Sequence, residues 1–283
     1  AFDEIFSSYL VHSEVRKKIK KIKKKEKILD YAKQDYLISK LDFKLTKDQL
    51  KVLNEINKDL SSNQKMFRLL QGDVGSGKTI VALISALNVI NSGFQVAVMA
   101  PTEILAKQHF NLAKKILGSF LKIELLSSKS EYKEKKRILN NLSSHKINLI
   151  FGTHSIFQKR VEFKNLGLII IDEQHKFGVN QRKMLSDKGG INCDVLLMSA
   201  TPIPRTLTMT IYGDMDLSII REKPDERKDI KTYTKLESKI NDIIKFIKKE
   251  IKLGNQVFWV CPIIEQSKKI NHTSAIAKFE FLT

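Results

Sequence analysis

Apolar and polar positions follow two different periods along residues 43–215. Short apolar runs without polar alternation have the length and character of strands that are buried on both faces of a sheet. These runs are residues 67–70, 95–100, 122–126, 148–151, 168–171 and 195–199. Segments with helical periodicity separate them, such as Glu103–Leu117 and Tyr132–Leu142. Strand–helix alternation of this kind predicts an α/β fold in which helices flank a parallel sheet.

The two ends of the chain have other patterns. Apolar residues at helical spacing predict an amphipathic helix near the amino terminus: Phe2, Ile5, Phe6, Tyr9 and Leu10. The basic run Arg16–Lys25 follows, and it is either a helix that contacts phosphates or a solvated helix extension. The polar residues 222–228 indicate a linker. After this linker the pattern predicts a lysine-rich helix at 239–252 and a buried strand at 256–261.

A complete phosphate-binding pattern, G-x-x-x-x-G-K-[ST], lies between the first predicted strand and a helix-like run. It consists of Gly72, Asp73, Val74, Gly75, Ser76, Gly77, Lys78 and Thr79. Glycines allow the backbone N–H groups to face a phosphate, and the following helix directs its amino terminus at the same anion. In this pattern the Lys78 ammonium reaches the β- and γ-phosphates, and the Thr79 hydroxyl ligates Mg²⁺.

A pair of carboxylates, Asp172 and Glu173, follows the apolar run Leu168–Ile171. We expect Asp172 to hold the metal through its water shell and Glu173 to orient the attacking water. Together with the phosphate loop, these carboxylates predict a hydrolase of nucleoside triphosphates. A small-molecule kinase with the same loop is the alternative enzyme class, although a kinase would not need the turns at 100–103 and 199–201.

Five turns with motif-like sequences are expected at one edge of the predicted sheet. In open parallel sheets, ligands bind where the carboxyl ends of the strands meet. The turns that follow predicted strands are residues 72–79, 101–103, 152–154, 172–173 and 199–201. The sequence therefore predicts a single working surface at this edge.

Composition adds information about the partner. The formal net charge of +19 and the pI near 9.7 favour a polyanion, nucleic acid first, although an excess of lysine can also follow from the base composition of a genome. No apolar run reaches the roughly 18 residues of a membrane span, and the first residues do not resemble a secretory signal, so no membrane partner is expected. Cys193 and Cys261 lie in apolar runs, which favours buried thiols in a reducing cytoplasm.

Several sequence blocks closely resemble the RecG family, bacterial superfamily 2 DNA translocases that remodel stalled replication forks and branch-migrate Holliday junctions. The main blocks are Phe43–Thr46 with Gln49, Arg68–Thr79, Ala100–His109, Gly152–His154, Ile171–Val179 and Met198–Leu207. Residues 212–216 and 256–265 also resemble this family, so the resemblance covers nearly the whole chain. The transcription-repair coupling factor Mfd shares the motor, but its carboxylate motif usually reads Asp-Glu-Glu. Here Gln174 follows Glu173, and Leu70–Gly72 is also closer to RecG.

The resemblance implies a RecA-like P-loop motor domain over residues 43–221. A helical linker, residues 1–42, would precede it, and a linker with the incomplete start of a second RecA-like domain, residues 222–283, would follow. The implied activity is that of an ATP-dependent DNA helicase, with ATP and Mg²⁺ as cofactors and branched or forked DNA as the partner. The resemblance also implies a monomer in the bacterial cytoplasm, associated with the nucleoid, with single-strand-binding protein as a candidate partner.

The roles of the family's residues can be carried over to the matching positions. Gln49 would recognise the adenine edge, while Gln174 and His175 would sense the γ-phosphate. Ser199 and Thr201 would relay the nucleotide state to the DNA side. Contacts with the DNA backbone are expected from Pro101, Thr102, Gly152, Thr153, His154 and Arg205. Without the resemblance, Gln49 would be interpreted as a glutamine on a helix surface, and each polar turn as an ordinary cap between a strand and a helix.

The chain also departs from the family's pattern. The amino-terminal wedge domain and the arginine finger of the second motor domain are not found in this sequence, so we expect the chain alone to bind ATP weakly and to hydrolyse it slowly. Asp42 stands where the family usually has proline, which puts a role of Phe43 near the adenine in doubt. The rival interpretation is a non-catalytic nucleic-acid-binding fragment with a vestigial nucleotide site. The intact set Lys78, Thr79, Asp172 and Glu173 argues against that interpretation.

Overall fold

The computed structural model of the chain consists of two compact units, residues 1–227 and residues 228–283. It describes residues 6, 7, 10, 14, 23–128, 130–172, 190–201, 215–222, 231–261 and 275–282. The larger unit contains the predicted motor domain. The predicted boundaries at residues 42 and 221 stay predictions.

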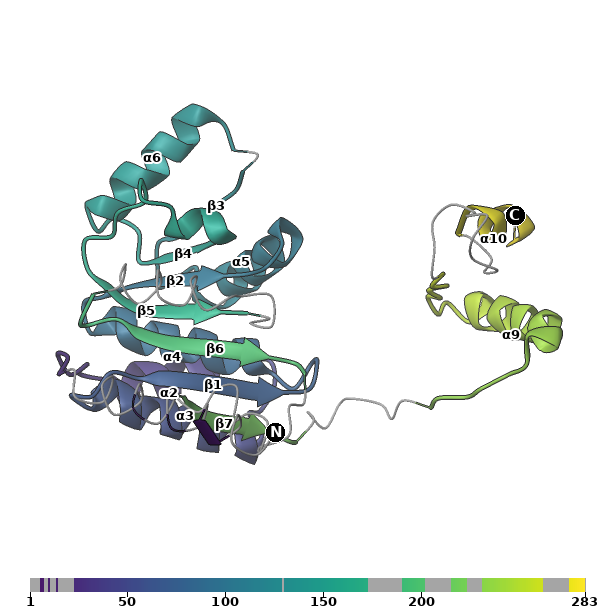
Figure 1. The fold of residues 1–283 in the computed structure, drawn as a ribbon, viewed down its shortest axis with the longest axis horizontal. Coiled ribbons are helices and arrows are strands. Elements are labelled where there is room, and N and C mark those ends of the chain that lie inside the picture. Colours follow the sequence, from purple (N-terminus) through teal and green to yellow (C-terminus); the bar gives the residue numbers. More distant parts are fainter. Residues whose placement is uncertain are drawn as a thin grey trace. The chain divides into compact units, whose positions relative to one another are not determined.

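Within the described residues, seven strands form one parallel sheet in the larger unit (Figure 1). In chain order they are β1 (Phe67–Gly72), β2 (Gln95–Met99), β3 (Ile123–Leu126), β4 (Leu149–Gly152), β5 (Leu166–Ile171), β6 (Asp194–Ser199) and β7 (Asp216–Ile220). Their spatial order is β3-β4-β2-β5-β6-β1-β7. Because every pair is parallel, all the carboxyl ends lie along one edge.

Helices cover both faces of this sheet. On one face, α2 (Tyr31–Ser39), α3 (Lys47–Ser61), α4 (Lys78–Asn91) and α5 (Glu103–Leu117) contribute to one apolar core with strand residues such as Leu70. On the other, α6 (Tyr132–Ser143) and the 3₁₀ helix η1 (His154–Phe157) share a second core with the alternate strand residues, such as Leu69. Successive strand residues point to opposite faces, so two buried faces produce the unbroken apolar runs. The predicted α/β fold is confirmed.

The six predicted strands of the larger unit coincide with β1 to β6 to within two residues. The predicted helices Glu103–Leu117 and Tyr132–Leu142 correspond to α5 and α6. The sequence pattern does not predict β7. That strand lies at the edge of the sheet, is only partly buried and mixes polar with apolar residues, so it lacks the signature of a strand enclosed on both faces.

Three buried amides join α2 to helices α3 and α4 of the larger unit. The Gln34 Oε1 atom accepts hydrogen bonds from Asn57 Nδ2 at 2.8 Å and from Asn88 Nδ2 at 2.7 Å. The Asn88 amide also donates to Asn57 Oδ1 at 2.9 Å. All three side chains are buried, which makes each bond costly to break. Helix α2 is therefore held to α3 and α4 by polar contacts as well as by apolar packing.

The described end of the basic run does not have the predicted helical structure. Lys23 forms an isolated antiparallel bridge with Gln64, and Lys24 is buried. The cause is Asp194 at the start of β6, a fully buried carboxylate that attracts two ammonium groups. Its Oδ2 atom lies 2.6 Å from Lys24 Nζ and 2.7 Å from Lys27 Nζ. Neither predicted alternative, a phosphate-contacting helix or a solvated extension, describes Lys24.

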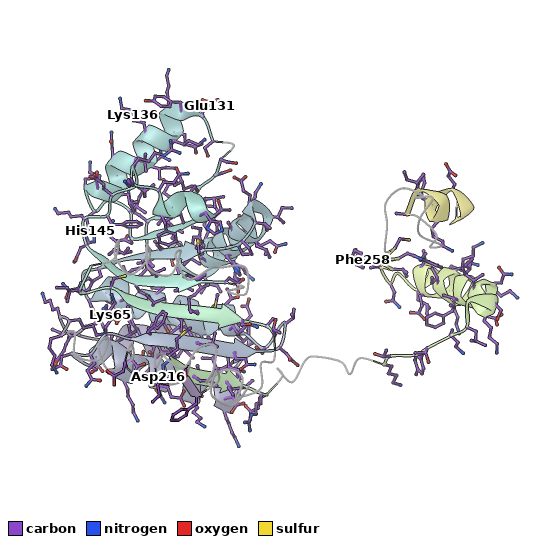
Figure 2. The ribbon with its side chains drawn as sticks, in the orientation of Figure 1. Lys65, Glu131, Lys136, His145, Asp216 and Phe258 are labelled. Atoms are coloured by element: carbon purple, nitrogen blue, oxygen red, sulfur yellow. The ribbon has the colours of Figure 1, made fainter. Side chains whose placement is uncertain are left out.

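The predicted lysine-rich helix of the smaller unit is confirmed as α9 (Ile240–Lys252), which follows the short 3₁₀ helix η3 (Glu237–Lys239). The other described element of the smaller unit is α10 (Ala275–Leu282). The prediction of a buried strand at 256–261 is wrong. Phe258, labelled in Figure 2, is 86% exposed, and no described residue pairs with this segment. A strand needs a neighbour to receive its backbone hydrogen bonds, and this segment has none among the described residues.

Both cysteines are free thiols, and only one of them is buried as predicted. Burial raises the pKa of the Cys193 thiol to about 12, whereas Cys261 is partly exposed. No helix within the described ranges is long and apolar enough to cross a membrane.

Candidate nucleotide and DNA site

Most of the predicted site residues lie at one edge of the sheet, as expected. The phosphate loop follows β1, Pro101 and Thr102 follow β2, and Thr153 and His154 follow Gly152, the last residue of β4. Asp172 follows β5, and Ser199 ends β6 just before Thr201. Glu173, Gln174, His175 and Arg205 lie outside the described residues, so their predicted roles stay predictions.

The phosphate loop has the backbone conformation that its glycines permit. Gly77 lies directly before α4 with φ of 85°, in the left-handed region. A Cβ atom at this position would come within 2.2 Å of Gln49 Nε2. Gly72 is also confined, because a Cβ there would meet Ser76 Oγ at 2.6 Å and the Ile220 carbonyl oxygen at 3.1 Å. These contacts explain why glycine stands at both positions.

Two polar groups of the loop support a fit to a phosphate anion. The Lys78 side chain is 9% exposed, and its Nζ atom donates hydrogen bonds to the carbonyl oxygens of Gly72 at 2.6 Å and Asp73 at 2.9 Å. The Ser76 hydroxyl is buried and has no hydrogen-bond partner among the described residues. A cation and an unsatisfied hydroxyl beside the amino terminus of α4 form a site that attracts negative charge.

Gln49 links helix α3 to the phosphate loop. Its Oε1 accepts a hydrogen bond from the Thr46 backbone N–H at 2.9 Å, and its own N–H donates to Thr46 Oγ1 at 3.2 Å, which makes a capping box. Its Nε2 donates to the Ser76 carbonyl oxygen at 2.8 Å. The Oε1 atom thus keeps one lone pair, and the Nε2 atom keeps one N–H, for hydrogen bonds to the edge of a base. Recognition of adenine by Gln49 stays a prediction.

The predicted metal-binding carboxylate, Asp172, is paired with a residue that the sequence reasoning did not single out. His109 on α5 donates from Nε2 to Asp172 Oδ2 at 2.7 Å. The Asp172 backbone N–H also donates to the Met99 carbonyl oxygen at 2.9 Å. His109 is the last residue of the block Ala100–His109, which resembles the RecG family. Its position in this block is the sequence feature that could have identified it as a site residue.

Gln71 is a second residue that the sequence did not predict for the site. It connects the phosphate loop with the predicted relay residues Ser199 and Thr201. Its Nε2 donates to the Thr201 carbonyl oxygen at 3.1 Å, and the Thr201 N–H donates to Ser199 Oγ at 3.2 Å. Gln71 and Ser199 are also paired across strands β1 and β6. The last residue before the loop therefore contacts the segment that would relay the nucleotide state. The relay itself stays a prediction.

The predicted DNA contacts include one confirmed helix cap. Thr102 Oγ1 accepts a hydrogen bond from the Leu105 N–H at 3.3 Å, so Thr102 caps α5. Thr153 starts η1 without such a bond. An exposed hydroxyl that caps a helix can still contact a phosphate, so the DNA contacts of Thr102, Thr153 and His154 stay predictions.

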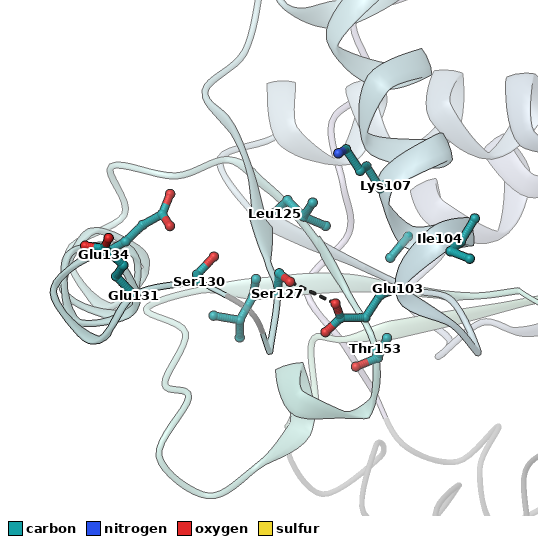
Figure 3. Close-up of a pocket in the computed structure, with 11 residues that line it drawn as sticks. Glu103, Ile104, Lys107, Leu125, Ser127, Ser130, Glu131, Glu134 and Thr153 are labelled. Atoms are coloured by element: carbon teal, nitrogen blue, oxygen red, sulfur yellow. Dashed lines mark hydrogen bonds between the residues drawn. The ribbon is translucent and has the colours of Figure 1, made fainter.

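A cavity of about 610 Å³ opens beside these turns (Figure 3). Its charged lining residues are Glu103, Lys107, Glu131 and Glu134. Glu103 accepts hydrogen bonds from the Ser127 hydroxyl at 3.0 Å and the Ser128 N–H at 2.6 Å, which ties the loop after β3 to α5. Three carboxylates against one ammonium make the interior of this cavity unfavourable for a phosphate.

Phe43 and Asp42 lie beside α5. Asp42 Oδ2 is 3.4 Å from Lys115 Nζ at the surface. Phe43 lines a cavity of about 380 Å³ with Tyr36, Phe120 and other residues of the α2 and α5 region, and no phosphate-loop residue lines it. These contacts give Phe43 no observed connection with the phosphate loop.

Comparison with known proteins gives consistent results. Residues 46–210 match the model of the DEAD/DEAH box helicase family. The chain is 46% identical over 281 residues to the ATP-dependent DNA helicase RecG of Aquifex aeolicus, which covers 99% of this chain and 36% of that protein. With the RecG helicase of Bacillus subtilis it shares 47% identity over 247 residues, covering 87% of this chain and 36% of the relative.

A solved structure of RecG bound to a three-way DNA junction matches all of this chain, with a TM-score of 0.84 and 38% identity. The match covers 100% of this chain and 37% of that one. The chain thus spans 36% of the length of the curated relatives. The predicted resemblance to the RecG helicases is confirmed.

Proposed function

The chain belongs to the DEAD/DEAH box helicase family, and we propose that it supplies the ATP-binding motor of a RecG-type helicase that remodels branched DNA. The observation that carries this proposal is the phosphate loop at the carboxyl end of β1, with Lys78 buried in it and Asp172 at the same edge of the sheet. A loop whose glycines, cation and buttressing Gln49 are all in place is suited to a triphosphate.

In the proposed reaction, ATP binds with its phosphates at the amino terminus of α4. The Lys78 ammonium would leave the carbonyls of Gly72 and Asp73 to neutralise the β- and γ-phosphate oxygens. Glu173 would orient the attacking water and accept its proton. Phosphoryl transfer is accelerated mainly by stabilising the negative charge that is distributed over the phosphate oxygens in the transition state. Lys78 should therefore lower the activation barrier more than any other side chain.

The residues proposed for Mg²⁺ are Thr79 and Asp172. A hydroxyl and a carboxylate are ligands of the type that Mg²⁺ prefers. When bound, Mg²⁺ would supply positive charge that stabilises the phosphates of the nucleotide. His109 would fix the carboxylate orientation through its bond to Asp172 Oδ2.

Branched DNA is the proposed partner. The solved RecG neighbour is bound to a three-way junction, and the net charge of +19 suits a polyanion. Pro101, Thr102, Gly152, Thr153, His154 and Arg205 would contact the backbone without reading sequence. We further propose that the protein acts as a monomer at the bacterial nucleoid and that single-strand-binding protein recruits it.

The proposal is tested by measuring nucleotide and DNA binding in the same preparation. We expect Mg²⁺-dependent binding of a fluorescent ATP analogue and salt-sensitive binding of DNA that does not depend on base sequence. A three-way junction should bind more tightly than a linear duplex with the same number of base pairs. Absence of ATP binding would remove the motor assignment, and equal affinity for the two DNA forms would remove the preference for branches.

Replacing His109 with alanine should raise the Mg²⁺ concentration required for half-maximal ATP binding by about tenfold, since a hydrogen-bonded partner that orients a metal-binding carboxylate contributes about that much to affinity. Binding of ATP without the metal should be unaffected. His145→Asn is the matched control, because His145 has φ of 62° and asparagine tolerates that conformation. An unchanged Mg²⁺ requirement in His109→Ala would show that His109 does not position Asp172.

A further inference from the structure

The first turn of α3 contacts two places that matter for a motor. One is the phosphate loop, which Gln49 reaches through the Ser76 carbonyl oxygen at 2.8 Å. The other is the end of β7, which Asp48 reaches. Asp48 Oδ2 accepts hydrogen bonds from the N–H groups of Arg221 at 2.8 Å and Glu222 at 3.1 Å. In return, the Asp48 N–H donates to Glu222 Oε2 at 3.0 Å.

Arg221 and Glu222 are the residues at which the chain leaves the sheet. They follow Ile220, the last residue of β7, and the sequence then continues into the smaller unit, which begins at residue 228. Ile220 is itself paired with Gly72, the first residue of the phosphate loop. Residues 221 and 222, which begin the connection between the units, therefore follow a strand residue that is paired with the phosphate loop. The same two residues are also hydrogen-bonded to Asp48 of α3.

The carboxylate of Asp48 is held in its ionised form by this arrangement. Hydrogen bonds from the N–H groups of Arg221 and Glu222 lower the pKa of Asp48 below its ordinary value. Asp48 and Arg221 also line a cavity of about 420 Å³ between α3 and β7. The hydrogen bonds from the Arg221 and Glu222 N–H groups to Asp48 are thus charge-assisted, and such bonds are stronger than neutral ones. The cavity leaves open space beside this contact.

We propose that Asp48 is a positioning residue that transmits the nucleotide state of the phosphate loop to residues 221 and 222. This inference rests on the proposed nucleotide site. Asp48 and Gln49 are consecutive residues in a helical turn made rigid by the capping box with Thr46, so a shift of the loop at Ser76 displaces both. A purely structural alternative exists, in which Asp48 only stabilises the amino terminus of α3 through the helix dipole.

Hydrogen exchange of the Arg221 and Glu222 amides separates the two roles. In the unmodified chain, a non-hydrolysable ATP analogue with Mg²⁺ should slow exchange of these amides by about tenfold, because the nucleotide would hold their hydrogen bonds to Asp48 closed, and the net contribution of one hydrogen bond corresponds to about that ratio. In Asp48→Ala the analogue should bind with affinity within about threefold, but the exchange of both amides should no longer respond to it. Asp48→Asn keeps an acceptor oxygen and should retain the response. Lys47→Ala, one residue away, is the matched control.

Two results would overturn the inference. One is a normal response in Asp48→Ala, and the other is no response in the unmodified chain although the analogue binds. In both cases the proposed nucleotide site would stand, because binding is measured in the same samples. If the analogue does not bind to the unmodified chain, the proposed function fails, and the inference fails with it.

Discussion

Replacing Asp194 with alanine should lower the free energy of unfolding of the larger unit by about 3–5 kcal/mol, the usual cost of removing one partner from a buried ion pair. The Asp194 carboxylate is fully buried and accepts hydrogen bonds from Lys24 Nζ, Lys27 Nζ and the Met66 N–H. The variant leaves two ammonium groups in the interior without their anion. Urea titration followed by far-ultraviolet circular dichroism measures the change, since the single tryptophan, Trp259, lies in the smaller unit.

A surface pair provides the control for this measurement. Asp42 and Lys115 are 3.4 Å apart, and their side chains are 83% and 75% exposed. Asp42→Ala should therefore change the stability by less than about 1 kcal/mol. Adding Lys24→Met and Lys27→Met to Asp194→Ala should recover part of the loss, because no charge is then buried without a partner. Equal losses in Asp194→Ala and Asp42→Ala would mean that the buried pair contributes no more than an exposed one.

Replacing Lys78 with alanine should weaken binding of Mg²⁺·ATP by about a hundredfold, since truncating one member of a buried charge pair costs a few kcal/mol. The fold should persist, because the hydrogen bonds that Lys78 donates to the carbonyl oxygens of Gly72 and Asp73 lie within the phosphate loop itself. Titration with a fluorescent ATP analogue measures the affinity, and circular dichroism checks the fold. Lys65→Ala is the control, since Lys65 donates to the Gly190 carbonyl oxygen at the surface.

A companion variant separates binding from chemistry. Glu173→Gln should bind ATP with nearly normal affinity and fail to turn it over, since glutamine cannot accept a proton from water. Normal turnover in Glu173→Gln, measured as phosphate release with DNA present, would remove Glu173 from the role of catalytic base. Normal ATP affinity in Lys78→Ala would remove the phosphate loop from the proposed site.

Much of the site could be predicted because parallel topology places every strand's carboxyl end at one edge. Once the apolar runs are recognised as buried strands, the positions of Lys78, Asp172 and Ser199 follow without any knowledge of their contacts. The contacts themselves could not be predicted. His109 reaches Asp172 from a helix 63 residues earlier in the sequence, and only the packing of α5 against the sheet, over β3 and β4, brings the two together.

Two wrong predictions have a common physical origin, which is that a local pattern does not specify its surroundings. A run of lysines suggests solvent or phosphate, but Lys24 lies opposite an acidic residue 170 positions later in the chain. An apolar run suggests a buried strand, but residues 256–261 form one only if neighbouring strands are present to bond with them. In the first case the deciding partner is distant in sequence, and in the second no described residue supplies one.

The buried contacts of Lys24, Lys27 and Gln34 anchor the segment 24–34 in the core of the larger unit. A polypeptide cut at residue 42 would leave the buried polar groups of Asp194, Asn57 and Asn88 without these partners. The same contacts define a path for mechanical load. A pull on the chain ahead of Lys23 would be borne at the amino ends of β1 and β6, on the opposite side of the sheet from the phosphate loop. Tension on the preceding residues would thus reach the sheet without passing through the nucleotide site.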